Sequence, residues 1–300
     1  MSCGVLTMAY GPESYLRMAK GLARSIRLRN PDFPLAIVTD RAPSELRRCF
    51  DVVVPMNPDF GPGLAQKLHL DKYAPFDKTL YMDADSLVFK DLRLIWDQFR
   101  DCVGLGLLGF YLDPGVPHYA IDDLPSYLRK VGIPRIVLTN TGILYLDGSP
   151  TTTRVFETAR AIATRAQDLG LKKHPAGFYN DEPIFGSVVE LLGLPFVRVA
   201  DHRDAGSSVE PVLTLACFGT DGMTDIDVRS GNARHELSGR TVSPAVIHFN
   251  VDSQGSRIYD RELRRLEYRW LGQRRLADAI TTTSWSLRRV RETLQRRVLS

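Results

Sequence analysis

Apolar and polar positions in the first half of the chain alternate between short continuous runs and runs at helical spacing. The continuous apolar runs lie at 3–9, 34–40 and 51–56. Segments with apolar residues at helical spacing follow them, at 13–30, 43–48 and 61–73. A short continuous run is typical of a buried strand, and a period near 3.6 residues is typical of an amphipathic helix. This alternation predicts an α/β fold with a mostly parallel, Rossmann-like sheet flanked by helices.

Beyond residue 100, the chain continues this pattern of strand-like and helical segments less regularly. Strand-like apolar runs lie at 102–112, 137–147, 195–200, 211–218 and 244–250. Helical spacing covers 152–169 and 180–193, and the polar segment 219–239 is expected to form loops. From residue 257 the pattern is helical and rich in Arg. We therefore predict one α/β domain over residues 1–256 and a basic, amphipathic helical extension over 257–300.

The apolar run at 79–89 is interrupted by two acids. Leu80 to Met82 lead into Asp83 and Asp85, and apolar residues resume at Leu87. A strand that ends in this way places both carboxylates at the carboxyl edge of the sheet, where open α/β folds bind ligands. Two close carboxylates repel each other unless a proton or a cation lies between them. Oxygen ligands suit Mn²⁺ or Mg²⁺, so one interpretation is a metal site that neutralises a diphosphate.

Two other interpretations of the acid pair stay open. The first is a solvated turn in which Asp83 or Asp85 caps a helix that starts near Asp91. The second is a phosphatase of the haloacid dehalogenase type, whose nucleophilic Asp also lies in a strand followed by Asp-x-Asp. That class carries the motif near the N-terminus, with Thr or Val two positions past the second Asp, where this chain has Leu87.

Composition narrows the class of protein. The 300 residues are 44% apolar and 25% charged, as in ordinary globular proteins. No apolar run is long enough to span a membrane, and no basic segment followed by an apolar one opens the chain, so a cytoplasmic protein is expected. The cysteines are far apart and lie beside apolar residues, which favours buried free thiols over disulfides or a zinc site; they are Cys3, Cys49, Cys102 and Cys217.

Charge is distributed unevenly along the chain. Residues 255–300 contain 12 Arg, no Lys and 5 acidic residues, a net charge of +7, whereas residues 1–254 carry −3. An acidic body is not typical of a nucleic-acid-binding protein. Trp270 and Trp285 lie among the arginines, as in surfaces that contact anionic lipid. A solvated helix that closes the domain is the alternative interpretation of this segment.

Five motifs, in order, resemble the retaining GT-A glycosyltransferases of family eight, the group of glycogenin and bacterial lipopolysaccharide galactosyltransferases. They are "VLTMAYGPESYLRMAKGLARSI", "QKLHLDKYAPFDKTLYMDADSLVF", "LTNTGILYLD", "YNDEPIFGSVVE" and "AVIHFN". The resemblance spans about residues 3–257. It implies a GT-A fold and a Mn²⁺ (or Mg²⁺) ion held by Asp83, Asp85 and His248. It also implies transfer of a hexose from a nucleotide-diphosphate sugar, expected to be UDP-linked, with retention of configuration.

The same resemblance assigns the other candidate residues. Those placed near the transferred sugar, as catalytic residues, are Asn140, Asp181 and Glu182. Those placed against the donor are Thr7, Tyr15, Lys67, Thr141 and Gly142, and Arg257 is a further donor-binding candidate that matches no residue of the family pattern. Judged from its own surroundings alone, His248 also fits a core strand, Lys67 a helix surface and Tyr15 the apolar face of its helix. The acceptor is expected to be a glycan, a lipid-linked group or a protein.

This chain departs from the family pattern in two places. Glu182 stands where the family often has Gln, so a carboxylate is available to stabilise a cationic sugar, to attack it, to bind the acceptor or to cap the helix. The family also follows its metal-binding His with Gly and then Lys-Pro-Trp, and this chain does not. Arg257 is the residue left to contact the diphosphate, at a longer spacing from His248.

Two further patterns are weaker. The stretch Gly104 to Gly109 matches Gly-x-Gly-x-x-Gly, but it lies in a strand-like run and opens no helix, which argues against a dinucleotide site. Asp113 fits a turn before Pro114 and, less well, a contact with a sugar. We predict a metal-dependent hexosyltransferase that is cytoplasmic or peripheral to a membrane. A catalytically inactive sugar-nucleotide-binding protein on the same fold is the alternative.

Overall fold

The computed structural model describes residues 2–113, 115–199, 214–216, 223–227, 232–235, 241–242, 244–249, 257–277 and 279. These residues fall into two compact units. The first lies within Met1–Gly11, Asp32–Ala84 and Leu92–Glu210. The second lies within Pro12–Pro31, Asp85–Asp91 and Pro211–Ser300. The boundary expected near residue 257 stays a prediction, and α9, which begins there, belongs to the second unit together with α1.

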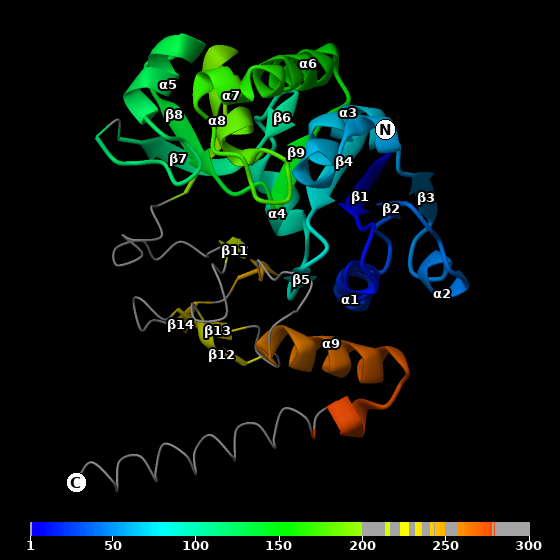
Figure 1. Cartoon of the computed structure of the whole chain (residues 1–300). Helices are drawn as coiled ribbons and strands as arrows, with labels where there is room; N and C mark the ends of the chain where they lie inside the picture. Colours follow the sequence, from blue (N-terminus) through cyan, green and yellow to red (C-terminus); the bar gives the residue numbers. More distant parts are fainter. Residues whose placement is uncertain are drawn as a thin grey trace, which may run out of the picture. The chain divides into compact units, whose positions relative to one another are not determined.

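The first unit is built on a six-stranded sheet (Figure 1). In spatial order its strands are β3 (Val52–Pro55), β2 (Leu35–Thr39), β1 (Cys3–Met8), β4 (Lys78–Met82), β9 (Ile143–Leu146) and β6 (Leu105–Gly106). The first four run parallel, and β9 is antiparallel to both β4 and β6. The predicted α/β class with a mostly parallel sheet is therefore confirmed. In the sheet, β1 lies between β2 on one side and β4 on the other, so the strand order changes direction at β1. Ligands of α/β sheets bind at such a switch in strand order.

Helices of the first unit pack on this framework. They are α2 (Ser44–Arg47), the 3-10 helices η1 (Pro58–Phe60) and η2 (Gly63–His69), α3 (Leu70–Tyr73), α4 (Arg93–Gln98), α5 (Leu124–Val131), α6 (Pro150–Thr164), α7 (Ala166–Leu169) and α8 (Glu182–Leu191). Ser149 caps α6 by accepting a hydrogen bond from the Thr152 backbone, and Pro150 occupies the first turn. Phe156 of α6 meets Phe185 of α8 edge to face at 5.5 Å in the core.

Two runs that the sequence predicted as single strands are divided between sheets. A second sheet of the first unit orders β10 (Val197–Arg198), β7 (Leu108–Leu112) and β8 (Ile136–Thr139). The run at 102–112 therefore forms β6 and β7, and the run at 137–147 forms β8 and β9. Between β8 and β9 the side-chain oxygen of Asn140 accepts a hydrogen bond from the Gly142 backbone at 3.0 Å. This Asn-centred turn redirects the chain from one sheet to the other.

The second unit contains two short sheets. In one, β15 (Val246–His248) pairs with β11 (Thr214–Ala216) in parallel and with β5 (Ser86–Val88) antiparallel. In the other, β12 (Met223–Asp227), β13 (Asn232–His235) and β14 (Thr241–Val242) are antiparallel. The prediction of loops over 219–239 was wrong for β12 and β13, because backbone ladders of antiparallel strands form without a continuous apolar run.

Helices α1 (Glu13–Arg29) and α9 (Arg257–Trp270) also belong to the second unit. They pack closely where α1 has a glycine. A Cβ atom on Gly21 would lie 2.1 Å from a methyl carbon of Leu263, so a larger residue there would displace the Leu263 side chain. On the same helix as Leu263, Tyr259 is fully buried.

Other expectations from the sequence need correction. The segment 61–73 is a 3-10 helix over Gly63–His69 and becomes α-helical only at Leu70. Helix α5 was missed, although Asp123 caps it and Gly132 ends it. Cys3 is exposed, whereas Cys49 and Cys102 are buried free thiols as expected, and Cys217 lies outside the described residues. In the described ranges, we find no helix whose length and apolar character would let it span a bilayer.

Candidate functional site

Asp83 is held at the end of β4 by three hydrogen bonds in the first unit. Its backbone N–H donates to the Gly142 carbonyl at 2.9 Å. Its carboxylate accepts from the Tyr81 hydroxyl at 2.6 Å and from the Lys67 ammonium at 2.8 Å. Helix α4 has Leu92 at its N-cap and no side-chain cap. The interpretation that Asp83 or Asp85 caps this helix is therefore not supported.

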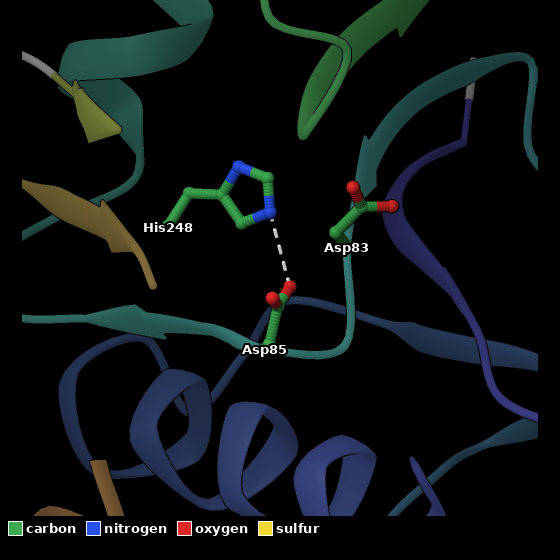
Figure 2. Close-up of side chains that lie close together, drawn as sticks. All are labelled: Asp83, Asp85 and His248. Carbon is green, nitrogen blue, oxygen red and sulfur yellow. Dashed lines mark ion pairs between the residues drawn. The ribbon is translucent and has the colours of Figure 1, made fainter. Parts of the chain in front are cut away.

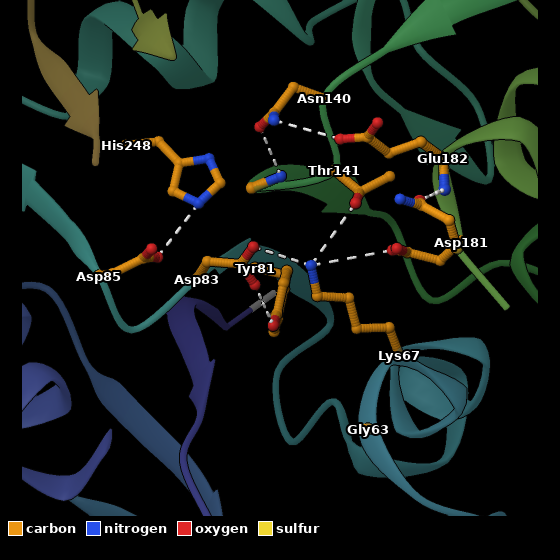
Figure 3. A network of polar contacts seen from close by, with 12 residues as sticks. Gly63, Lys67, Tyr81, Asp83, Asp85, Asn140, Thr141, Asp181, Glu182 and His248 are labelled. Carbon is orange, nitrogen blue, oxygen red and sulfur yellow. Dashed lines mark hydrogen bonds and ion pairs between the residues drawn. The ribbon is translucent and has the colours of Figure 1, made fainter. Parts of the chain in front are cut away.

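Lys67 lies between carboxylates rather than on a helix surface. It is 5% exposed, and its ammonium lies 2.8 Å from Asp83 and 3.8 Å from Asp181. It also approaches the Thr141 hydroxyl at 3.5 Å (Figure 3). Burial by itself lowers the pKa of Lys67, but the charges of Asp181 and Asp83 outweigh it and raise that pKa above its ordinary value. The side chain therefore stays a cation.

Asp181 and Glu182 form the start of α8. Asp181 is 1% exposed, and burial raises the pKa of its carboxyl although the Lys67 charge opposes the shift. Glu182 accepts a hydrogen bond from the Asn140 side chain at 3.2 Å, and its backbone N–H donates to the Asn180 side chain at 2.9 Å. The resemblance placed Asn140, Asp181 and Glu182 around one sugar, and the structure brings these three residues together with Lys67 (Figure 3).

Asp85 and His248 meet within the second unit because of strand register. Antiparallel pairing of β5 with β15 sets His248 opposite Ser86, the residue after Asp85. The His248 Nε2 atom lies 3.1 Å from a carboxylate oxygen of Asp85, and the Phe249 backbone donates to the Asp85 carbonyl at 3.2 Å. Both side chains are almost fully buried. His248 is thus in a core strand, as one interpretation had it, and still faces a carboxylate.

Asp83, Asp85 and His248 fit the ligand set of a divalent cation. Only Ala84 separates the two acids, so the backbone itself keeps them close. One ligand atom from each of the three residues lies within 4.8 Å of the others (Figure 2). Two carboxylates and an imidazole suit Mn²⁺ and related ions. Each carboxylate oxygen of Asp83 that accepts one hydrogen bond retains a lone pair for a metal.

The remaining expected residues lie in different places. Thr7 is buried in β1, and its hydroxyl has no hydrogen-bond partner within the described part of the chain. Tyr15 is half-buried on α1 in the second unit. Arg257 is the first residue of α9, and its side chain lies outside the described set. Asp113 accepts a hydrogen bond from the Gly115 backbone at 2.9 Å, which supports the turn interpretation.

Two tyrosines of the site were missed by sequence reasoning. Tyr81 precedes Asp83 by two residues, and strand alternation places such side chains on the same face, so this contact was available from the sequence. Tyr119 donates its hydroxyl hydrogen to the Glu182 carboxylate. No local signal links these two, because 63 residues separate them.

Comparison with known proteins identifies the fold. No protein-family model and no curated protein sequence matches this chain. Among solved structures, it is similar to the galactosyltransferase LgtC in complex with donor and acceptor sugar analogues, at 18% identity and a TM-score of 0.55, over 89% of this chain and 99% of that one.

Two more solved structures agree with this similarity. An active-site Gln-to-Glu variant of LgtC matches at 17% identity and a TM-score of 0.51, over 83% of this chain and 88% of that one. The bifunctional glycosyltransferase WbbM matches at 12% identity and a TM-score of 0.50, over 84% of this chain and 46% of that one. The chain therefore has the fold of the GT-A glycosyltransferases, as the five sequence motifs implied.

Proposed function

We propose that this protein is a metal-dependent glycosyltransferase that moves a hexose from a nucleotide-diphosphate sugar, expected to be a UDP-sugar, to an acceptor hydroxyl with retention. The observation that carries the proposal is the group of Asp83, Asp85 and His248 at the carboxyl end of β4. Lys67, buried beside Asp83, is the second support. The phosphatase interpretation loses its basis, because the fold is that of GT-A enzymes.

The balance of charge explains why a metal is needed. Among the described residues, the carboxylates of Asp83, Asp181 and Glu182 all act on Lys67, so this part of the site carries more negative than positive charge. A diphosphate would be repelled from such a site. A divalent cation held by Asp83, Asp85 and His248 would supply the positive charge that binds the diphosphate and stabilises its departure. Mn²⁺, or Mg²⁺, is proposed here because two of the three ligands are carboxylates, which suit these ions.

The residues of the first unit have distinct roles in the proposed reaction. The acceptor oxygen forms a bond to the anomeric carbon, and the bond from that carbon to the diphosphate oxygen breaks. The electron pair leaves with the diphosphate, which also takes the acceptor proton. Lys67 faces the developing negative charge. Asn140, Asp181 and Glu182 orient the sugar, and the carboxylates favour its transient positive charge. A double displacement with Glu182 as nucleophile is the competing route.

Replacing Glu182 by Gln distinguishes these two routes. We expect Glu182→Gln to lower kcat by about 10- to 100-fold, because charge stabilisation is lost while orientation is kept. Donor affinity should stay within about twofold, since the loss falls on the transition state. Glu190→Gln on the same helix, a residue paired with Arg135, is the matched control. A loss beyond about a thousandfold, on the order of 4 kcal/mol, would favour a covalent role for Glu182 instead.

His248 gives a test of the metal that does not need an active assay. Mn²⁺ with UDP should raise the melting temperature of the wild type, because a ligand that binds only the folded state stabilises it. We expect His248→Ala to lose most of this shift while the unliganded protein still folds. The control is His174→Ala, which removes an imidazole that stacks on Phe178 and is not among the proposed metal ligands. A full shift in His248→Ala would make His248 a core residue only.

We also propose that the end of α9 makes peripheral contact with an anionic membrane, and exposed apolar residues among arginines are the reason. Trp270, Leu271 and Leu276 are 41%, 60% and 51% exposed. Arginines surround them, at 264, 269, 274 and 275. The other face of α9 buries Tyr259, Leu263 and Leu266 in the second unit. The C-terminal end of the helix, at Trp270, remains exposed to solvent. Trp285, also expected to take part, lies outside the described residues.

Vesicle cosedimentation tests this contact. Each basic residue near an anionic bilayer contributes roughly 1 kcal/mol, so a few arginines suffice for peripheral binding at low salt. We expect pelleting with anionic vesicles and release at high salt, because screening shortens the reach of these charges. Trp270→Ala should weaken the binding, whereas Trp96→Ala, in the first unit, should not. Equal pelleting with neutral vesicles would leave α9 as a closing helix alone.

A further inference from the structure

We infer that Tyr119 is a positioning residue that fixes the carboxylate of Glu182 in one orientation. The inference rests on the role proposed above for Glu182. Tyr119 lies in the segment between β7 and α5, and its hydroxyl donates to one carboxylate oxygen of Glu182. The Asn140 side chain donates to the other oxygen at 3.2 Å. Glu182 is therefore held from both sides, as a clamp would hold it.

The Tyr119 hydroxyl is itself oriented by a third residue. The Asn180 side chain donates to this hydroxyl at 2.8 Å, so the hydroxyl hydrogen is directed toward Glu182. The side-chain oxygen of Asn180 accepts from the Glu182 backbone at 2.9 Å. One asparagine thus ties the tyrosine and the start of α8 together. Burial of the hydroxyl and the Glu182 charge raise the pKa of Tyr119, so it remains a donor at neutral pH.

The backbone around Tyr119 is anchored although its side chain is 54% exposed. Lys172 donates its ammonium to the Tyr119 carbonyl at 3.2 Å and its backbone N–H to the Ala120 carbonyl at 2.9 Å. Ile121 pairs with Leu171 in an antiparallel bridge. The His118 ring is buried and stacks on the Tyr119 ring at 4.9 Å. Such anchoring suits a residue whose task is to hold another in place.

A carboxylate needs this clamp more than an amide would. The family often has Gln at this position, and an amide both donates and accepts, whereas a carboxylate only accepts. Two donors, Tyr119 and Asn140, match the two oxygens of Glu182. Without Tyr119, one oxygen would lose a donor that orients it, and a misplacement of about 1 Å can cost a hundredfold in rate. The clamp therefore accounts for how this chain uses Glu where Gln is common.

The test is Tyr119→Phe in two backgrounds. In the wild-type background we expect kcat for transfer to fall about 10- to 100-fold, with donor affinity unchanged within about twofold. In the Glu182→Gln background the same change should cost less than about threefold, because residues that act as a unit are not additive. Tyr127→Phe is the matched control: it also removes a hydroxyl that bonds to α8, through Ser187 at 2.8 Å, but it leaves Glu182 alone.

The outcomes separate this inference from the proposed function. Absence of both transfer and metal-dependent donor binding in the wild type would overturn the proposed function. Wild-type transfer with Tyr119→Phe at the level of the Tyr127→Phe control would overturn the role of Tyr119 only. Equal losses in both backgrounds would also overturn it. Urea unfolding should compare the wild type, Tyr119→Phe, Glu182→Gln and the double variant. The losses of unfolding free energy should be non-additive, and additive losses would mean that the hydrogen bond between Tyr119 and Glu182 does not form in solution.

Discussion

Asp85→Asn is expected to lower transfer by at least about a thousandfold, on the order of 4 kcal/mol in barrier. Asn keeps the shape of the side chain but removes the negative charge that a divalent cation requires. The Asp85 carboxylate also faces His248 at 3.1 Å, so its loss disturbs the second residue of the proposed metal site. Calorimetric titration with Mn²⁺ and UDP should show that metal-dependent nucleotide binding is lost in the variant.

The control for Asp85→Asn is Asp97→Asn. Asp97 pairs with Arg100 on the surface of α4, so the same chemical change there should leave binding and transfer unaltered. An Asp85→Asn protein that binds Mn²⁺ and UDP like the wild type would remove Asp85 from the metal site.

Lys67→Met is expected to cause the largest loss of stability. It removes the cation between Asp83 and Asp181, so the buried Asp181 carboxylate and the partly buried Asp83 carboxylate both lose their contact with the Lys67 ammonium. Breaking a buried pair in this way costs about 3–5 kcal/mol of unfolding free energy. Adding Asp181→Asn should restore part of the loss, because it removes one of the uncompensated charges. Lys72→Met is the control, since Lys72 is largely exposed beside Asp71.

The loss in Lys67→Met should depend on pH. Burial already raises the pKa of Asp181 above its ordinary value of 3.8, and without Lys67 that pKa rises further. A carboxyl with a raised pKa binds its proton more tightly in the folded than in the unfolded state, so stability falls as pH rises through this range. Urea unfolding should therefore show a smaller deficit at about pH 5 than at about pH 8. An equal deficit at both values would mean that the carboxylates are not the cause.

The sequence predicted the backbone of the site better than its side-chain contacts. Strands β1, β2, β3 and β4 follow from short apolar runs, and the acid pair at the end of β4 marks the edge of the sheet where the function is proposed. Spacing does not say which sheet a strand joins, so the divisions at β6 and β7 and at β8 and β9 were not foreseen. The turn at Asn140, which causes the second division, was visible only as a break in the apolar pattern.

Contacts between residues far apart in the sequence were the second part of the site that the sequence could not predict. His248 was assigned by resemblance, and the register of β15 against β5 is the physical reason why it meets Asp85. Lys67 was also assigned by resemblance, and nothing in its local pattern indicates burial. Tyr119 belongs to no motif and to no periodic apolar pattern. Its contact with Glu182 depends on how the loop that holds Tyr119 is anchored beside the start of α8. Residues of this kind become visible only once the fold is known.

The most direct test of the central claim is metal-dependent release of nucleoside diphosphate from a panel of nucleotide-diphosphate sugars by the wild-type protein. The account predicts that at least one sugar nucleotide, expected to be a UDP-sugar, is turned over with Mn²⁺ or Mg²⁺. A chelator should stop the reaction, and added metal should restore it. Turnover that continues in full with the chelator present, or no release and no binding for any member of the panel with metal, would contradict the account.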